Sequence, residues 1–322
     1  METDYILRTK NLTKIYKKKK IIGDININIK KGAVYGLVGR NGAGKSTTMK
    51  MIFGLVSPTS GEVNFSDEFQ EKPDWRLKVS ASFGETSFYR YLSAKENMEV
   101  QRKSLKIKDK KKSDEILDLM GLGDVGNKPS GHFSLGMKQR LSLSISLLGE
   151  PEFLVLDEPT NGLDPVGIKE IRSMITDLHQ KGVTIMISSH LVNELPKIVT
   201  DYGFIGKGRL IEEFSSEELK ERVKPCIVLK VNDTKSAIDL IIDKLNLSDY
   251  RIEDREIKFF TDKSNLNVIS KLLAEHEIII EYIRAEGGDY EDYFIKTMER
   301  ADEKNSNSDK VDDHDHEENE DA

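Results

Sequence analysis

Residues Gly39 to Ser46 carry the clearest chemical pattern in the chain. They read Gly-Arg-Asn-Gly-Ala-Gly-Lys-Ser and match G-x-x-x-x-G-K-[ST], between an apolar run (33–38) and a helical stretch (45–53). Glycines let the backbone wrap closely around phosphate groups, and a helix N-terminus attracts anions. We expect Lys45 to reach the β- and γ-phosphates and the Ser46 hydroxyl to bind Mg²⁺. The alternative is a glycine-rich turn without a ligand. The candidate nucleotide-binding residues are Gly39, Arg40, Asn41, Gly42, Ala43, Gly44, Lys45, Ser46 and Thr47.

Two adjacent carboxylates end a second apolar run. Asp157 and Glu158 follow Phe153–Leu156 and precede a turn that begins at Pro159. In P-loop enzymes a carboxylate at the end of such a strand holds the Mg²⁺ of the nucleotide, and Asp157 is the candidate here. Neighbouring side chains on a strand point in opposite directions, so Glu158 is free to take a proton from an attacking water. The alternative is an acidic cap on the following turn.

The elements around these motifs alternate between strand and helix. Apolar runs at 33–38, 153–156 and 183–188 are typical of buried strands. Isoleucines alternate within 21–30, which is typical of a half-buried antiparallel strand. We therefore expect an α/β fold, a P-loop NTPase with a mainly parallel sheet and an antiparallel β subdomain. The helical patterns between the strands lie at 45–53, 136–148 and 167–179.

The rest of the chain predicts three further parts. Residues 86–149 are mainly helical in pattern and form a helical subdomain within a first domain that spans 1–222. The pattern of 223–300 restarts as β-α-β-β-α-β with an added helix, which predicts a small C-terminal α+β domain. Residues 301–322 hold ten acidic residues and two lysines with few apolar groups, so we expect a disordered acidic tail.

The composition limits the class of protein. The chain has 322 residues and a formal charge of −7, most of it in the tail, so the body is nearly neutral. No apolar run reaches the roughly 20 residues that cross a bilayer. The first residues, 1–4, lack the basic-then-apolar pattern of a secretory signal, and the single Cys226 excludes a disulfide framework. We expect a cytoplasmic protein that reaches the membrane only through a partner.

Further motifs follow in a fixed order along the chain. Phe133-Ser134-Leu135-Gly136-Met137-Lys138-Gln139-Arg140 looks like a variant of the signature L-S-G-G-Q, and Asn161-Gly162-Leu163-Asp164 follows the carboxylates. Tyr16 precedes the phosphate loop, and His190 follows the third buried strand. Together with 39–46 and 153–158, these landmarks resemble those of the ATP-binding cassette (ABC) superfamily, in the form of the ATPase subunit of a transporter. The resemblance covers roughly residues 5–215.

The resemblance implies a mechanism and further roles. Two cassettes enclose two ATP molecules head to tail, so that Ser134 and Gly136 of one copy bind the γ-phosphate held by Lys45 of the other. Asp164 lies in the loop that bridges the two copies, and His190 contacts the γ-phosphate. Tyr16 stacks on adenine. Closure of the pair drives an integral membrane permease on whose inner face the two subunits sit, and hydrolysis reopens the pair.

Three positions depart from the family pattern. Glu85 stands where the family has a glutamine, and a carboxylate cannot donate a hydrogen bond. We expect Glu85 to keep a role as Mg²⁺ ligand with weaker nucleotide affinity. Leu135 replaces the first signature glycine and Met137 replaces the usual glutamine. This variant signature looks like that of cassettes that export lantibiotics, bacitracin or other peptides, which implies export of a drug or peptide antibiotic.

Other interpretations stay open for several residues and for the whole chain. Tyr16 could be a packing aromatic, His190 a polar residue at a strand end, and Asp164 the N-cap of a helix that begins at Pro165. The basic stretch 102–112 is expected to be a solvated surface. The rival function is a soluble ABC ATPase that acts on ribosomes or nucleic acid. A single copy of each motif and a nearly neutral body disfavour it, so no nucleic acid partner is expected.

Overall fold

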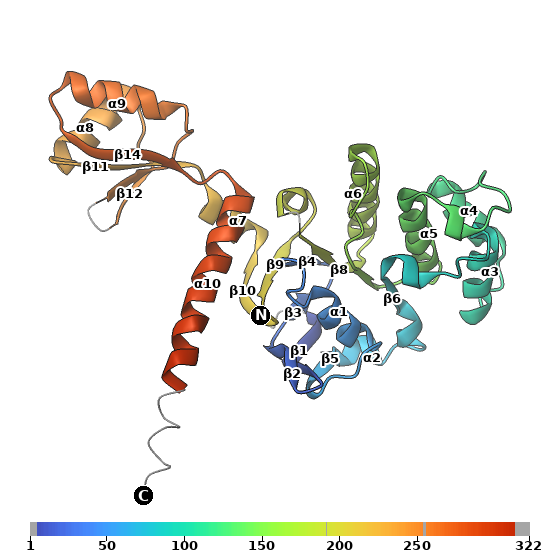
Figure 1. Ribbon diagram of the computed structural model, residues 1–322. Coiled ribbons are helices and arrows are strands. Elements are labelled where there is room, and N and C mark those ends of the chain that lie inside the picture. The colour runs from blue at the N-terminus through green and yellow to red at the C-terminus, as the bar shows by residue number, and fades with distance from the viewer. Residues whose placement is uncertain (1–4, 191, 254–255, 313–322) are drawn as a thin grey trace, which may run out of the picture. The chain divides into compact units, whose positions relative to one another are not determined.

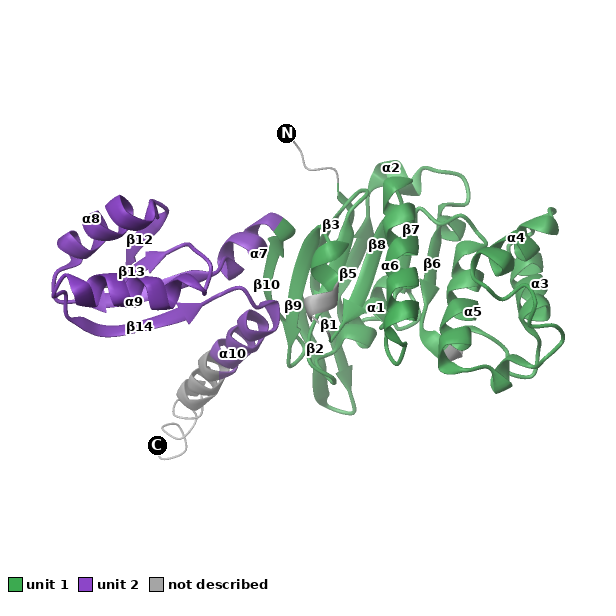
Figure 2. Ribbon diagram, turned by 90° about the horizontal axis from the view of Figure 1, so that it is seen from above, with its two compact units in different colours: residues 1–216 green, residues 217–322 purple. Residues whose placement is uncertain are grey.

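The computed structural model describes residues 5–190, 192–253 and 256–312, and the side chains of 85–86, 192–194 and 303–312 lie outside that description (Figure 1). The chain divides into two compact units, unit 1 (Met1–Ser216) and unit 2 (Glu217–Ala322) (Figure 2). The division falls at the start of helix α7 (Ser216–Val223). The domain boundary predicted from the sequence, after residue 222, lies at the other end of that helix.

A six-stranded sheet forms the centre of unit 1. Its strands in chain order are β4 (Val34–Val38), β6 (Val79–Ser82), β7 (Phe153–Leu156), β8 (Thr184–Ser189), β9 (Asp201–Gly206) and β10 (Arg209–Ser215). They lie in the order β10-β9-β4-β8-β7-β6, all parallel except β10, which is antiparallel to β9. Every residue of β4, β7 and β8 is buried, as is usual for parallel strands covered on both faces. The predicted parallel sheet is confirmed.

A second, antiparallel sheet of four strands packs beside the first. Its strands are β1 (Tyr5–Tyr16), β2 (Lys19–Ile25), β3 (Asn28–Lys30) and β5 (Ser60–Phe65). The prediction of a single strand at 21–30 is wrong, because two residues outside any strand separate β2 from β3. Asp24 adopts a φ of +56°, and the Asn26 side chain donates to the Asp24 carbonyl oxygen at 3.0 Å. The alternation still holds, since Ile25, Ile27 and Ile29 are all fully buried.

The helices of unit 1 follow strands of one of the two sheets or form a helical subdomain. Their bounds are α1 (Lys45–Phe53), α2 (Asp67–Gln70), α3 (Ala94–Ser104), α4 (Lys111–Leu119), α5 (Leu135–Leu147) and α6 (Pro165–Gln180). The connecting 3-10 turns are η1 (Trp75–Lys78), η2 (Gly84–Ser87), η3 (Ser130–His132) and η4 (Val192–Lys197). Helices α3, α4 and α5 share a separate apolar core that includes Met98, Leu117 and Leu141. A capping box of Ser93 and Glu96 starts α3.

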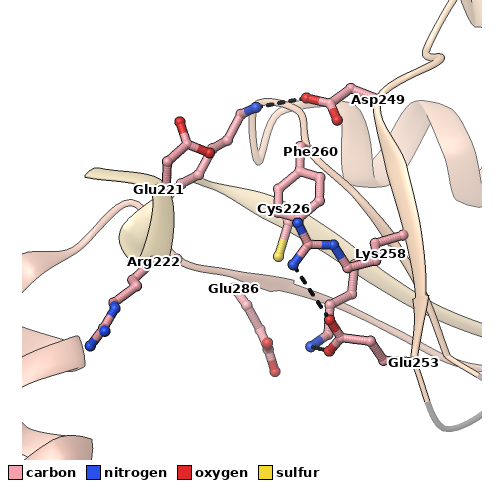
Figure 3. A pocket seen from close by; sticks show the side chains of 11 residues that line it. Glu221, Arg222, Cys226, Asp249, Glu253, Lys258, Phe260 and Glu286 are labelled. Atoms are coloured by element: carbon pink, nitrogen blue, oxygen red, sulfur yellow. Dashed lines mark hydrogen bonds and ion pairs between the residues drawn. The ribbon is translucent and has the colours of Figure 1, made fainter. Parts of the chain in front are cut away.

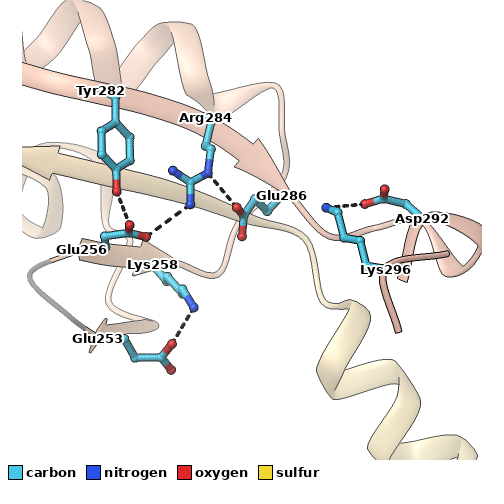
Figure 4. A network of polar contacts seen from close by, with 8 residues as sticks. All are labelled: Glu253, Glu256, Lys258, Tyr282, Arg284, Glu286, Asp292 and Lys296. Carbon is cyan, nitrogen blue, oxygen red and sulfur yellow. Dashed lines mark hydrogen bonds and ion pairs between the residues drawn. The ribbon is translucent and has the colours of Figure 1, made fainter. Parts of the chain in front are cut away.

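Unit 2 contains a four-stranded sheet with all neighbours antiparallel. After α7, its elements are β11 (Cys226–Val231), α8 (Thr234–Leu245), β12 (Tyr250–Glu253), β13 (Glu256–Phe259), α9 (Asn265–Glu275) and β14 (Ile280–Glu286). The strand order is β12-β13-β11-β14. Helices α8 and α9 cover one face and bury an apolar core around Leu229, Ile257 and Phe259. The chain order matches the predicted β-α-β-β-α-β pattern. The other face carries charged side chains (Figure 4).

The last helix, α10 (Tyr290–Asp312), extends beyond its predicted end at Arg300. The first part of the expected acidic tail, 301–312, is therefore helical, and residues 313–322 lie outside the described residues. The ion pair of Lys296 with Asp292 at 2.8 Å stabilises the preceding turns of this helix. Within the described ranges, no helix combines the length and apolarity needed to cross a bilayer.

Candidate active site

The phosphate loop connects β4 to α1 and presents open backbone donors. Gly42 and Gly44 adopt φ values of +79° and +105°, which residues with a side chain rarely reach. A Cβ at Gly39 would lie 2.5 Å from the carbonyl oxygen of Ile205, so this position also requires glycine. Gly44 is the N-cap of α1, and no side chain caps that end. The first N–H groups of α1 are therefore available to an anion.

The structure brings together the three predicted catalytic residues. The Lys45 ammonium is 5% exposed, and its Nζ lies 2.7 Å from the Gly39 carbonyl oxygen and 3.0 Å from Glu158 Oε1. The other carboxylate oxygen, Glu158 Oε2, is hydrogen-bonded to His190 Nδ1 at 2.6 Å. The three residues follow β4, β7 and β8, which are neighbours in the sheet, so the carboxyl ends of parallel strands assemble the group. A base and a cation thus lie beside a phosphate-sized cradle.

Asp157 is positioned by a hydroxyl from the neighbouring strand. The Ser188 Oγ donates to Asp157 Oδ1 at 2.8 Å and accepts from the Glu158 backbone N–H at 2.8 Å. The Asp157 N–H donates to the Ser82 carbonyl oxygen at 3.0 Å. Asp157 and Glu158 are both half-buried. One serine hydroxyl therefore holds the side chain of one acidic residue and the backbone of the next, and orients the pair.

Glu158 has an unusual backbone conformation. Its φ is +50°, in the left-handed region that costs free energy for a residue with a Cβ. The Glu158 carbonyl oxygen accepts hydrogen bonds from the Asn161 N–H at 3.1 Å and from Gln139 Nε2 at 3.4 Å. The turn after β7 thus holds the candidate base in a strained conformation with bonds on both sides of the residue.

The signature residues start helix α5. Ser134 is the exposed N-cap, and its Oγ accepts from the Met137 N–H at 3.3 Å. Leu135 is 46% exposed and packs against the turn after β7: a Cβ at Gly162 would lie 2.3 Å from its Cδ2. Leu163 Cδ2 lies 3.4 Å from the corresponding point on Gly136. Ser134 and Gly136 bond within their own helix or pack on this turn, and no contact joins them to Lys45 among the described residues.

Asp164 caps a helix, as the alternative interpretation predicted. Its Oδ1 accepts from the Gly167 N–H at 2.9 Å, and Pro165 occupies the first position of α6. This contact does not exclude a second role for the carboxylate, because one of its oxygens is sufficient for the cap.

Two further predicted ligands belong to other elements. Tyr16 ends β1, is 46% exposed, and has the Lys14 Nζ 4.8 Å from its ring centroid. An exposed ring is available for stacking. Glu85 belongs to η2, and its side chain lies outside the part of the chain that the structure describes.

Sequence reasoning missed Ser188, Ser82 and Gln139 as parts of the site. Ser188 was recognised only as part of the strand before His190. Its contacts depend on β8 lying beside β7. Gln139 is buried and its Nε2 donates to the Glu158 carbonyl oxygen, while its Oε1 has no hydrogen-bond partner among the described residues. The signal was present, since Gln139 lies in the signature segment, but no pattern connected it to Glu158.

Comparisons with known proteins match the chain to one family. A family profile described as ABC transporter matches residues 22–161. The chain is 39% identical over 297 residues to the bacitracin transport ATP-binding protein of Bacillus licheniformis, which covers 91% of this chain and 97% of that protein. It is 45% identical over 219 residues to a lantibiotic transport ATP-binding protein of Streptococcus pyogenes, covering 67% of this chain and 95% of that one.

A solved structure gives the same picture for the fold. The dimeric structure of an ATP-binding cassette in a post-hydrolysis state, bound to ADP and Pi, matches with a TM-score of 0.58 and 26% identity over 65% of this chain and 98% of that one. Fold and site together define a P-loop ATPase of the ATP-binding cassette class. The chain belongs to the family of ABC transporter ATP-binding proteins, with which it shares sequence over nearly the whole length of its relatives.

Proposed function

We propose that this chain is the ATP-hydrolysing subunit of a membrane exporter for a peptide antibiotic, with bacitracin-like peptides as the favoured cargo. The observation that carries the proposal is the assembly of Lys45, Glu158 and His190 around the phosphate loop, in a chain similar to transport ATP-binding proteins along its length. The rival function on ribosomes or nucleic acid is not favoured, because these relatives are named as transport proteins.

Unit 2 favours bacitracin over lantibiotic cargo. The bacitracin transport proteins of Bacillus licheniformis and Enterococcus faecalis align with 91% and 92% of this chain, so most of unit 2 is included. The alignment with the lantibiotic transport protein covers 67% of this chain and 95% of the lantibiotic transport protein. Its length therefore leaves no counterpart for most of unit 2. The shared unit separates this chain from the lantibiotic type and groups it with longer relatives, among which the bacitracin transport protein of Bacillus licheniformis is 39% identical.

The residues of one cassette bind and polarise the nucleotide. The N–H groups of the phosphate loop and the Lys45 ammonium hold the β- and γ-phosphates. The phosphate oxygens replace the Gly39 carbonyl and the Glu158 carboxylate as hydrogen-bond acceptors of Lys45 Nζ. Tyr16 stacks on the adenine ring. Glu158 accepts the proton of the attacking water, and His190 orients its carboxylate and contacts the γ-phosphate.

The residues near the phosphate loop fit a Mg²⁺ ion held mainly by the nucleotide. Ser46, half-buried in the first turn of α1, and Asp157, oriented by Ser188, offer one hydroxyl and one carboxylate. Mg²⁺ commonly takes only one or two protein ligands together with substrate phosphates and water. Mg²⁺ would neutralise charge on the phosphate oxygens. Glu85, in η2 after β6, is a third candidate ligand in place of the family's glutamine.

A second copy completes the site. Ser134 and Gly136 of each copy bind the γ-phosphate held by Lys45 of the other, and Asp164 lies at the contact between them. Ser134 is exposed at the N-terminus of α5, where backbone N–H groups attract an anion. The closed pair, bound to the cytoplasmic side of an integral membrane permease, drives transport. ATP binding favours the closed state because only that state has both sets of phosphate contacts.

Transport in cells tests this function. The chain would be expressed with the permease encoded beside it, identified by about six apolar stretches of roughly 20 residues, and bacitracin tolerance would be measured against a lantibiotic. We expect tolerance to bacitracin to rise with the native chain and not with Lys45→Ala, which removes the phosphate contact. An increase that persists in Lys45→Ala would contradict the ATP-driven mechanism, and an increase for lantibiotics alone would contradict the cargo.

A further inference from the structure

The open face of the unit 2 sheet is covered by internally paired charges. It carries a cavity of about 340 Å³ in whose lining Lys224 pairs with Asp249 at 2.6 Å and Lys258 with Glu253 at 2.5 Å (Figure 3). Beside it, Arg284 bonds Glu286 at 2.7 Å and Glu256 at 3.3 Å (Figure 4). Arg251, 3.7 Å from Glu253, adds a fourth cation to the four carboxylates named here, so these residues balance in charge.

The edge of the same sheet is different. Strand β12 is the last strand in the order β12-β13-β11-β14, and all four of its residues are exposed. Two of them are apolar, Tyr250 at 38% and Ile252 at 53% exposure. The opposite edge, β14, is half-buried along most of its length. Exposed apolar edge strands readily pair with another strand, and proteins usually cover or charge them.

The backbone of β12 offers hydrogen-bonding groups to such a strand. The Phe260 N–H donates to the Asp249 carbonyl oxygen at 2.9 Å, in the register that also places Arg251 opposite Lys258. In an antiparallel pair, successive residues direct their N–H and C=O groups to alternate sides. The backbone groups of Arg251 therefore face β13, and those of Tyr250 and Ile252 point outward from the sheet.

The sequence of β12 is complementary to itself. Arg251 and Glu253 lie on the charged face, on either side of Ile252. When two such strands run antiparallel with Ile252 opposite Ile252, Arg251 of each copy lies opposite Glu253 of the other. A register with Arg251 opposite Arg251 would place like charges together, which destabilises a sheet. Of these two registers, only the first places opposite charges against each other.

We propose that unit 2 binds a second copy of this chain through β12, in a two-fold antiparallel pairing centred on Ile252. The pair joins the two sheets into one and covers the exposed Ile252 side chains. Such an interface is isologous, because each copy contributes the same surface. The pairing needs no nucleotide and therefore goes beyond ATP-driven closure of the cassettes. Two four-residue strands bury little area, so the contact acts mainly between copies held at one permease, where the effective concentration is high.

Cysteine cross-linking of the full chain, co-expressed with the permease encoded beside it and measured without nucleotide, tests the register. A hydrogen-bonded antiparallel pair has Cα atoms about 5.5 Å apart, within reach of a disulfide. Ile252→Cys should therefore form a disulfide-linked dimer about tenfold faster than Val268→Cys, a position of similar exposure (47%) on α9. The wild type is the baseline, because Cys226 is 6% exposed and burial raises the pKa of its thiol. Equal rates for the two variants would overturn the proposal.

Charge reversal in the Ile252→Cys background tests the complementarity. Arg251→Glu changes two attractive pairs into two repulsive ones and should slow cross-linking about tenfold. Adding Glu253→Arg restores opposite charges in the same register and should restore the rate, while Arg251→Lys alone should leave it nearly unchanged. A rate unaffected by Arg251→Glu, or not restored by the double change, would overturn the proposal. Melting temperatures of all variants show that unit 2 stays folded.

Discussion

Glu158 carries both the proposed base and a strained backbone. Its carboxylate contacts Lys45 and His190, while its φ of +50° is unfavourable for any residue with a Cβ. Glycine would adopt this conformation without strain, yet it could not accept a proton. The residue type at 158 thus follows the chemistry, and the hydrogen bonds of the turn offset the strain.

The strain is measurable with a matched pair of variants. Glu158→Ala and Glu158→Gly both remove the carboxylate, and only glycine tolerates the positive φ. We expect Glu158→Gly to be more stable than Glu158→Ala by about 1 kcal/mol, measured by thermal or denaturant unfolding. Both variants should lack ATPase activity. A less stable glycine variant would show that the left-handed conformation does not occur at residue 158.

Ser188 links the two acidic residues, and its removal should affect turnover more than binding. Ser188→Ala deletes the hydroxyl that bonds Asp157 Oδ1 and the Glu158 N–H. We expect the ATPase rate to fall about tenfold, since each lost bond to a charged or buried group costs about 1–2 kcal/mol. ATP affinity should change little. Ser144→Ala on α5, where the hydroxyl bonds only the Arg140 carbonyl, is the control and should keep its activity.

Sequence patterns predict the residues with obvious chemistry but not the residues that hold them by hydrogen bonds. Asp157 and Glu158 were found because an apolar run ended in two carboxylates. The role of Ser188 depends on β7 and β8 being neighbours, which follows from the sheet order and from no local pattern. The positive φ of Glu158 gave no signal either, because glutamate is not a residue that usually marks such a turn.

At the level of elements, helix α6 begins with a residue that has two interpretations. Asp164 caps the helix through Gly167 and also lies in the loop proposed to bridge two cassettes. Asp164→Asn keeps a side-chain acceptor and removes the charge, whereas Asp164→Ala removes both. We expect Asp164→Ala to lose about 1 kcal/mol of stability and Asp164→Asn much less. Equal ATP-dependent dimerisation of Asp164→Asn and the wild type would show that the carboxylate acts only as a cap.

Element boundaries were predictable where local chemistry fixes them. Helix α1 begins at Lys45 because the glycine loop ends there, and β11 spans the apolar run Cys226–Val231. The interruption between β2 and β3 was not predictable, because Asp24 adopts a left-handed conformation inside an otherwise regular alternation of apolar residues. The extension of α10 to Asp312 was missed because composition alone favoured disorder for a charged segment.

At the level of the whole molecule, the proposed function requires two copies. Glu158→Gln keeps the shape of the side chain but removes its basicity, so ATP should remain bound and an ATP-dependent dimer should accumulate. Ser134→Arg adds bulk and charge at the exposed start of α5 and should block closure while leaving ATP binding to the single chain largely intact. Light scattering after size-exclusion chromatography, with and without Mg-ATP, measures both.

Two results would contradict this interpretation of the pair. A Glu158→Gln protein that stays monomeric at saturating Mg-ATP would argue against head-to-tail closure. A Ser134→Arg protein that dimerises as Glu158→Gln does would show that the signature residues do not lie at the contact between the two copies. Melting temperatures of both variants, measured in parallel, separate a loss of closure from a loss of folding.

The contact between Leu135 and Gly162 has a consequence for how these chains diverge. The branched side chain that stands in place of the signature glycine occupies the space in which any Cβ at 162 would have to fit, with 2.3 Å between the two points. Substituting either position therefore constrains the other. Gly162 also has a φ of +72°, which favours glycine. Across homologous exporters we therefore expect glycine at 162 wherever a branched residue stands at 135, and any other residue at 162 only beside a smaller residue at 135.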